Sequence, residues 1–115
     1  MTLKQFLADV RTYPTRAHVK HPGFRELYVR RTRRFLGGQL CSPVLDLASM
    51  EAKTPGKGAF TKLIRDLRAQ HPELYLFVEC VLNPRLIGKL QELGFTRCDS
   101  GESICFYLPP VKDTP

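Results

Sequence analysis

The stretch KTPGKGAFTKLIRDL, residues 53–67, joins a glycine-containing loop to an amphipathic segment, and it decides how the chain folds. Apolar side chains recur at the i, i+3, i+4 and i+7 positions of one helix face, at Phe60, Leu63, Ile64 and Leu67. The sequence therefore predicts a helix that begins after Gly58 and packs on a sheet.

Two segments that flank this helix have the pattern of strands. VLDLASMEA, residues 44–52, leads into the loop, and LYLFVECVL, residues 74–82, is nearly unbroken apolar sequence of the kind found in a central strand. Because a strand, helix and strand in this order form a right-handed crossover, we expect the two strands to run parallel.

The remaining elements are shorter. Helices are expected over residues 2–12 and, between Pro84 and Gly94, over residues 84–94. The segment TYPTRAHVKHPGF, residues 12–24, has the composition of a loop. Strands are expected over residues 28–36 and 103–108. Another strand is expected to begin at Gln39, after a reversal at Gly37 and Gly38, and to be interrupted by Pro43. The 115 residues suffice for one domain, here residues 1–108, followed by a loose tail, residues 109–115.

Composition limits the classes of function. The net charge of +7 and the pI near 9.5 favour polyanionic partners such as nucleic acid, an anionic membrane face or a phosphorylated ligand. No apolar run is long enough to span a membrane, and the first 14 residues carry charges where a signal peptide is apolar, so we expect a cytoplasmic protein. The four cysteines form no CxxC pair, so we predict reduced thiols and no metal site.

The positive charge is concentrated in YVRRTRRFL, residues 28–36. In a strand, Arg30 and Arg34 share one face, and Arg31 and Arg33 share the other. Two interpretations remain open: a solvated edge strand that its charges protect from aggregation, or a specific site for an anion.

Two motifs together resemble a known family. PGKGAFTKLI, followed by VECVLNPRLIGKLQELGF, resembles the GNAT superfamily of acetyl-CoA-dependent N-acetyltransferases, and most closely its small phage and bacterial members. The resemblance covers roughly residues 40–108. It implies an α+β fold with a mixed, mostly antiparallel sheet, in which helices flank a central parallel pair of strands that splay apart. It also implies transfer of an acetyl group from acetyl-CoA to an amine of a protein or small molecule, in the cytoplasm (the host cytoplasm for a phage protein).

The resemblance also implies which residues bind the cofactor. The loop is similar to the family pattern Gln/Arg-x-x-Gly-x-Gly/Ala, in which Gly58 matches while Pro55 and Phe60 do not. Backbone amides would bind the coenzyme A diphosphate at Lys57, Gly58, Ala59, Phe60 and Thr61. The pantetheine arm would pair with backbone near Met50 and Ala52 and lie beside Asn83, and Arg85 would lie near the phosphates or the adenine.

The catalytic expectations are less complete. The Met50 amide would polarise the thioester carbonyl. The acids near the diverging strands are Asp46, Glu51 and Glu79, and Glu79 is the sole charge in an apolar strand, where burial makes a carboxylate a candidate base. The alternative is that Glu79 only pairs with Arg85 or Lys89.

One position departs from the family. Where a Tyr often protonates the leaving thiolate, this chain has Leu90, so solvent or another side chain such as Cys80 would have to substitute. A GNAT-shaped binding or inhibitory protein is therefore a second interpretation. The third is a basic nucleic-acid-binding module that uses Arg30, Arg31, Arg33 and Arg34. We expect a monomer, or a homodimer that pairs through an exposed final strand.

Overall fold

A computed structural model describes residues 1–8, 15–79, 84–99, 101 and 103–111. The helices are α1 (Leu3–Ala8), α2 (Ala59–Gln70) and α3 (Pro84–Glu92). The strands are β1 (Arg16–His18), β2 (Phe24–Leu36), β3 (Gln39–Ala52), β4 (Tyr75–Val78), β5 (Thr96–Arg97) and β6 (Phe106–Leu108).

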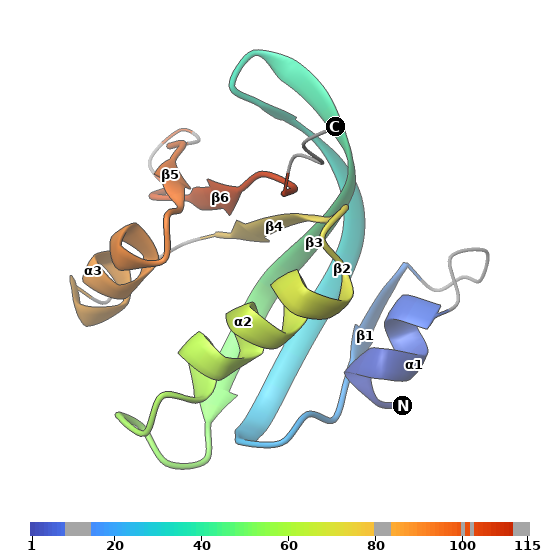
Figure 1. Cartoon of the computed structure of the whole chain (residues 1–115), viewed down its shortest axis with the longest axis vertical. Helices are drawn as coiled ribbons and strands as arrows, with labels where there is room; N and C mark the ends of the chain where they lie inside the picture. The colour runs from blue at the N-terminus through green and yellow to red at the C-terminus, as the bar shows by residue number, and fades with distance from the viewer. Residues whose placement is uncertain (9–14, 80–83, 100, 102, 112–115) are drawn as a thin grey trace.

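Within these residues the six strands form one sheet in the order β1-β2-β3-β4-β6-β5 (Figure 1). Only β3 and β4 pair in parallel, and every other neighbouring pair is antiparallel. The chain thus has the α+β fold, with a mixed, mostly antiparallel sheet, that the sequence predicted.

The parallel pair is the part of the sheet that the sequence predicted best. Helix α2 makes the crossover, and the pairing runs from Val44 opposite Tyr75 to Leu47 opposite Val78. Strand β3 then continues to Ala52, while β4 turns away from it (Figure 1). A stretch of β3 that leads to the glycine loop therefore extends past its described pairing with β4.

The two faces of the sheet differ in what covers them. Helix α2 packs on one face, where its buried Leu63, Ile64 and Leu67 join Leu45 and Leu47 of β3 in the main core. The other face has a smaller apolar cluster of Leu36, Cys41, Val44, Phe77 and Cys105. The tip of the β2–β3 hairpin curls over this second face, and an added Cβ at Gly37 would lie 3.1 Å from the Tyr107 hydroxyl.

The hairpin itself forms where it was predicted, with differences of detail. Gly37 and Gly38 have positive φ values of 59° and 81° and make the reversal. Pro43 does not interrupt β3, contrary to expectation. The pairing of β2 with β3 shifts register here: Thr32 faces Val44, but Arg34 faces Cys41. Pro43 has no N–H to donate, and it lies in this irregular part of the ladder, where strands tolerate proline.

Four other features differ from what the sequence predicted. Residues 16–18, within the segment predicted to be a loop, form β1 on the edge of β2, and β2 begins at Phe24, four residues before the predicted start at Tyr28. Strand β5 was not predicted. The final strand is not an exposed edge as expected, because β6 lies between β4 and β5. A homodimer stays a prediction without the pairing edge that was expected for it.

Some predicted stretches cannot be compared with the structure. Residues 9–12 of the first predicted helix and residues 80–82 of the predicted central strand lie outside the described residues. The looseness of the tail, residues 109–115, stays a prediction. None of the helices in the described ranges is both long and apolar enough to cross a bilayer.

Candidate functional site

The loop between β3 and α2 contains two glycines whose backbone has a left-handed conformation. Gly56 and Gly58 have φ values of 83° and 78°, in the left-handed region that favours glycine. Gly58 caps α2, and no side chain hydrogen-bonds to the first turn. The first hydrogen bond of the helix runs from the Lys62 N–H to the Gly58 carbonyl, at 3.0 Å. The N–H groups of the residues between them therefore have no acceptor within the helix.

A cavity of about 440 Å³ opens beside this loop. Three lysines, Lys53, Lys57 and Lys62, line it together with one acidic residue, Asp66. His21 also lines the cavity, and partial burial lowers the pKa of His21 from its usual value, which favours the neutral imidazole. The loop, the helix terminus and the lysines together make this a positively charged recess.

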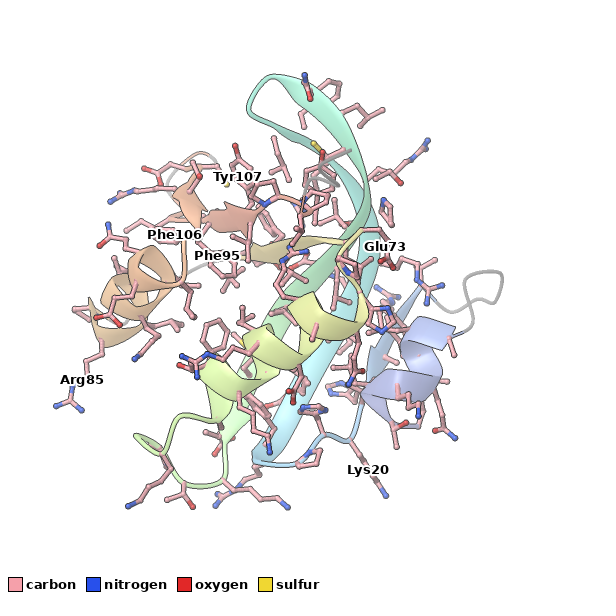
Figure 2. All side chains as sticks on the ribbon, in the orientation of Figure 1. Lys20, Glu73, Arg85, Phe95, Phe106 and Tyr107 are labelled. Carbon is pink, nitrogen blue, oxygen red and sulfur yellow. The ribbon has the colours of Figure 1, made fainter. Side chains whose placement is uncertain are left out.

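The other predicted cofactor-binding residues fall in different places. Met50 and Ala52 are half-buried on the part of β3 beyond Leu47, where the prediction needs them. Arg85 extends outward from the start of α3, away from the body of the molecule (Figure 2). Asn83 lies outside the described residues.

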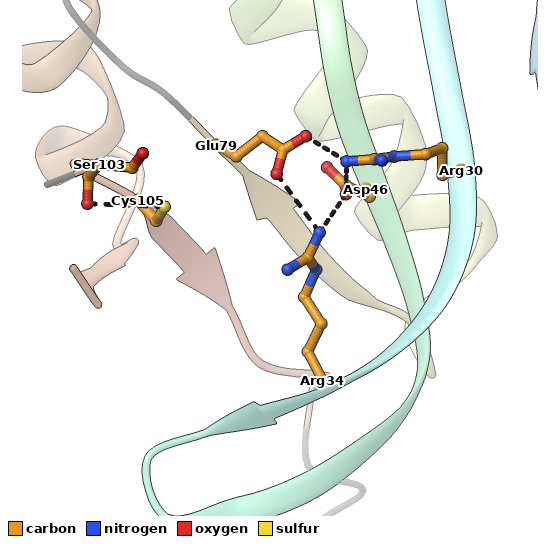
Figure 3. Close-up of polar contacts among 6 residues, drawn as sticks. All are labelled: Arg30, Arg34, Asp46, Glu79, Ser103 and Cys105. Atoms are coloured by element: carbon orange, nitrogen blue, oxygen red, sulfur yellow. Dashed lines mark hydrogen bonds and ion pairs between the residues drawn. The ribbon is translucent and has the colours of Figure 1, made fainter. Parts of the chain in front are cut away.

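The predicted acids meet on the second face of the sheet. Arg30 Nη2 donates to Asp46 Oδ2 at 2.9 Å, and Arg34 Nη2 donates to the same oxygen at 2.6 Å (Figure 3). Glu79, just after β4, accepts from Arg34 at 3.4 Å and also from Arg30. We call these four residues the Arg–Asp–Arg–Glu cluster.

Burial separates the two carboxylates of this cluster. The Asp46 side chain is 0% exposed, and its Oδ1 has no hydrogen-bond partner among the described residues, whereas the Glu79 side chain is 24% exposed. Partial burial lowers the pKa of Arg30, but the charges of Asp46 and Glu79 outweigh this and raise it overall. Asp46 is therefore placed to hold the arginines, while Glu79 is the carboxylate that a ligand can reach. Their catalytic roles stay predictions.

The expected partners of Glu79 were wrong. Glu79 pairs with Arg30 and Arg34 rather than with Arg85 or Lys89, and Lys89 lies 3.4 Å from Glu92 instead. Glu51, the third acid considered, lies 3.5 Å from Arg25 in an exposed pair.

Arg30 and Arg34 share the second face, as the alternation predicted, but Arg33 departs from it: this residue lies at the register shift between Thr32 and Arg34 and lines one pocket with Arg31 and another with Arg34. Arg31 lies on the helix-covered side, with its guanidinium 4.8 Å from the Phe6 ring, and it donates to the Phe6 carbonyl. Arg33 is exposed. Because Arg30 and Arg34 form ion pairs within the chain, they are less available to a nucleic acid than the sequence suggested.

Leu90 is 0% exposed and packs in the main core, so this position supplies apolar packing and no proton donor.

Comparison of the chain with protein-family models, with curated proteins and with solved structures gives no significant match.

Two features of the candidate site could not be read from the sequence. The pairing of Arg30 and Arg34 with Glu79 joins residues 49 and 45 positions apart, and only the strand alternation hinted that both arginines share a face. The contribution of His21 to the lysine-lined recess had no local signal. The lysines at 53, 57 and 62, by contrast, bracket the glycine loop in the sequence and could have been grouped with it.

Proposed function

We propose that the chain is a GNAT-like N-acetyltransferase, which takes an acetyl group from acetyl-CoA and transfers it to an amine. The observation that carries the proposal is the end of the β3–β4 pairing. Beyond Leu47, β3 continues for five residues without a described partner on its β4 side and then enters a glycine loop at a helix start. We propose a cytoplasmic location as well.

The residues present suit an elongated anionic cofactor. An extended amide-bearing arm can pair with the backbone edge of β3 near Met50 and Ala52, as an added strand does. The uncapped start of α2 offers N–H groups and the positive end of the helix dipole to a diphosphate. Lys53, Lys57 and Lys62 add charge beside it. Acetyl-CoA would supply an activated acetyl thioester there.

The acceptor side is proposed to be the second face, at Glu79. This carboxylate follows the last paired residue of β4, and it is partly exposed while Asp46 behind it is not. Arg30 and Arg34 hold Glu79 in place, and its negative charge attracts an ammonium group and can take up the proton that the amine loses. No described side chain is assigned the protonation of the leaving thiolate.

The direct test is a calorimetric titration of the purified protein with acetyl-CoA, with desulfo-CoA and ADP titrated in parallel. We expect micromolar binding that requires the pantetheine arm. If ADP binds as tightly as acetyl-CoA, the edge of β3 is not a pantetheine site. If none of the three binds, the proposal is wrong.

A matched pair of variants tests the loop. An added Cβ at Gly58 meets no atom within 4 Å, and Asp and Asn are the side chains found most often in the left-handed region, so the two variants share the same backbone strain and differ in charge. Gly58→Asp places a negative charge beside the proposed diphosphate and should weaken acetyl-CoA binding about tenfold relative to Gly58→Asn. Equal affinities would remove the diphosphate from this loop.

A further inference from the structure

A small pocket on the second face adjoins the Arg–Asp–Arg–Glu cluster. It has a volume of about 240 Å³ and is lined by Arg33, Arg34, Phe35, Leu36, Phe77 and Cys98. Leu36 and Phe77 are 6% and 3% exposed and give it an apolar wall. Because the β2–β3 hairpin curls over this face, the end of β2 lies near Phe77 of β4 and near Cys98, which follows β5.

Arg34 belongs to both the cluster and the pocket. Its guanidinium carbon lies 4.2 Å from the centre of the Phe77 ring, and its Nη2 is bound to Asp46 and Glu79. These contacts fix the plane of the guanidinium, while its Nη1 takes part in no described hydrogen bond. A group bound at Nη1 would therefore sit next to Glu79.

Arg33 is the other charged residue of the pocket, and it is exposed. No described residue forms an ion pair or hydrogen bond with its side chain. Within the cluster the charges of Arg30 and Arg34 are balanced by those of Asp46 and Glu79, so Arg33 leaves the pocket and the cluster together with a net positive charge. The free donor fork of an arginine suits a carboxylate or a phosphate.

We propose that this pocket binds an anionic group, a carboxylate or a phosphate, carried by the acceptor amine. Arg33 and the free side of Arg34 hold the anion, and the amine lies toward Glu79. The acceptor is then an amine with an acidic group close by, rather than a purely cationic amine. This inference rests on the proposed acetyl transfer.

The test compares amines that differ only in the anion. O-phosphoethanolamine is compared with ethanolamine, and β-alanine with propylamine, by measuring kcat/KM for acetyl transfer from acetyl-CoA. The anionic member of at least one pair should be preferred about tenfold, and the two pairs distinguish phosphate from carboxylate. Rising salt should reduce the preference, because the pocket is open to solvent.

Variants assign the preference to this pocket. Arg33→Ala should bring the ratio between the anionic and the neutral amine close to one, and Arg33→Lys, which keeps the charge without the fork, should fall between. Arg65→Ala is the matched control, because Arg65 is an exposed arginine on α2, outside the pocket. A ratio near one in the unmodified protein would overturn the subsite and leave the acetyl transfer standing.

A binding measurement decides the case in which no amine is acetylated, which would count against the proposed function. Acetate and inorganic phosphate are titrated into ¹⁵N-labelled protein without acetyl-CoA, and the amide signals of Phe35, Leu36 and Phe77 are followed by NMR. Shifts that saturate and that Arg33→Ala abolishes support the anion pocket even then. Shifts that are absent, or unchanged in Arg33→Ala, overturn it.

Discussion

The two faces of the sheet are stabilised in different ways, and strand β3 shows both at successive residues. Leu45 and Leu47 point to the helix-covered face and pack against α2, whereas Asp46 between them is equally buried but charged. The contacts that Leu45 and Leu47 make need only apolar groups of suitable size. Those on the second face need particular partners, because a buried carboxylate is tolerated only when other groups satisfy it.

Specific polar contacts are concentrated on the second face. The helix-covered face holds the fold together, while the second face holds ionised groups in fixed positions beside a pocket. Variants on each face test whether the two faces differ in this way.

The largest loss of stability is expected on the helix-covered face. Leu63 is 0% exposed in the middle of α2, so Leu63→Ala should leave a cavity and lower the free energy of unfolding by about 3–4 kcal/mol. Urea denaturation followed by circular dichroism measures this. Leu63→Met, which nearly conserves volume, is the control and should cost less than about 1.5 kcal/mol.

A smaller loss is expected on the second face. Asp46→Asn keeps the shape but removes the charge that Arg30 and Arg34 share, and it should cost about 2 kcal/mol, because both arginines can turn toward water and Glu79 remains as a partner. The same denaturation assay, with Arg34→Met added to form a double-mutant cycle, should show coupling between the two sites. A cost above that of Leu63→Ala would reverse the order of the two faces.

Glu79→Gln should affect function more than stability. Since Glu79 is partly exposed, its loss should change the free energy of unfolding by less than about 1 kcal/mol. If Glu79 receives the proton of the acceptor, kcat should fall about tenfold or more, with little change in acetyl-CoA affinity. Equal losses in turnover and in cofactor affinity, or a lower melting temperature alone, would mark Glu79 as structural.

Cys98 also lies on the second face, where it packs against the smaller apolar cluster. Burial raises the pKa of this thiol to about 11, and the neighbouring Cys105 and Asp99 add to the shift. At pH 8 its alkylation by iodoacetamide should be on the order of 100-fold slower than in the unfolded chain, because the thiolate is the reactive form. Peptide mass spectrometry measures this rate at Cys98.

The raised pKa of Cys98 also makes the stability of the protein depend on pH. Because the pKa of Cys98 is higher in the folded state than its ordinary value of 9.0, the folded protein is more stable below pH 9 than above it. The unfolded chain loses its proton first as the pH rises, so the free energy of unfolding should fall above pH 9. Cys98→Ser should flatten that dependence, and an unchanged slope would contradict the assignment to Cys98.

The sequence predicted the elements whose signals are local. The spacing of Phe60, Leu63 and Leu67 gave α2, and the glycine pair at 37 and 38 gave the hairpin reversal. The order of strand, helix and strand was enough to predict the parallel pair, because the handedness and length of such crossovers leave few alternatives.

The elements that were missed depend on contacts distant in sequence. Strands β1 and β5 have three and two residues, too few for a periodic pattern, and they exist because β2 and β6 offer edges to pair with. At the site, the alternation predicted that Arg30 and Arg34 share a face. The spacing of residues could not show that Asp46 would be the completely buried partner between them.

Strand β6 has a consequence for the synthesis of the chain. Because β6 lies between β4 and β5, β5 has no described neighbour in the sheet until Phe106–Leu108 have been made and have left the ribosome. The long β2–β3 hairpin, by contrast, is complete in itself once Ala52 has emerged. During translation, β4 therefore has no described partner on that side until β6 has emerged, and the sheet is completed only when Phe106–Leu108 are available.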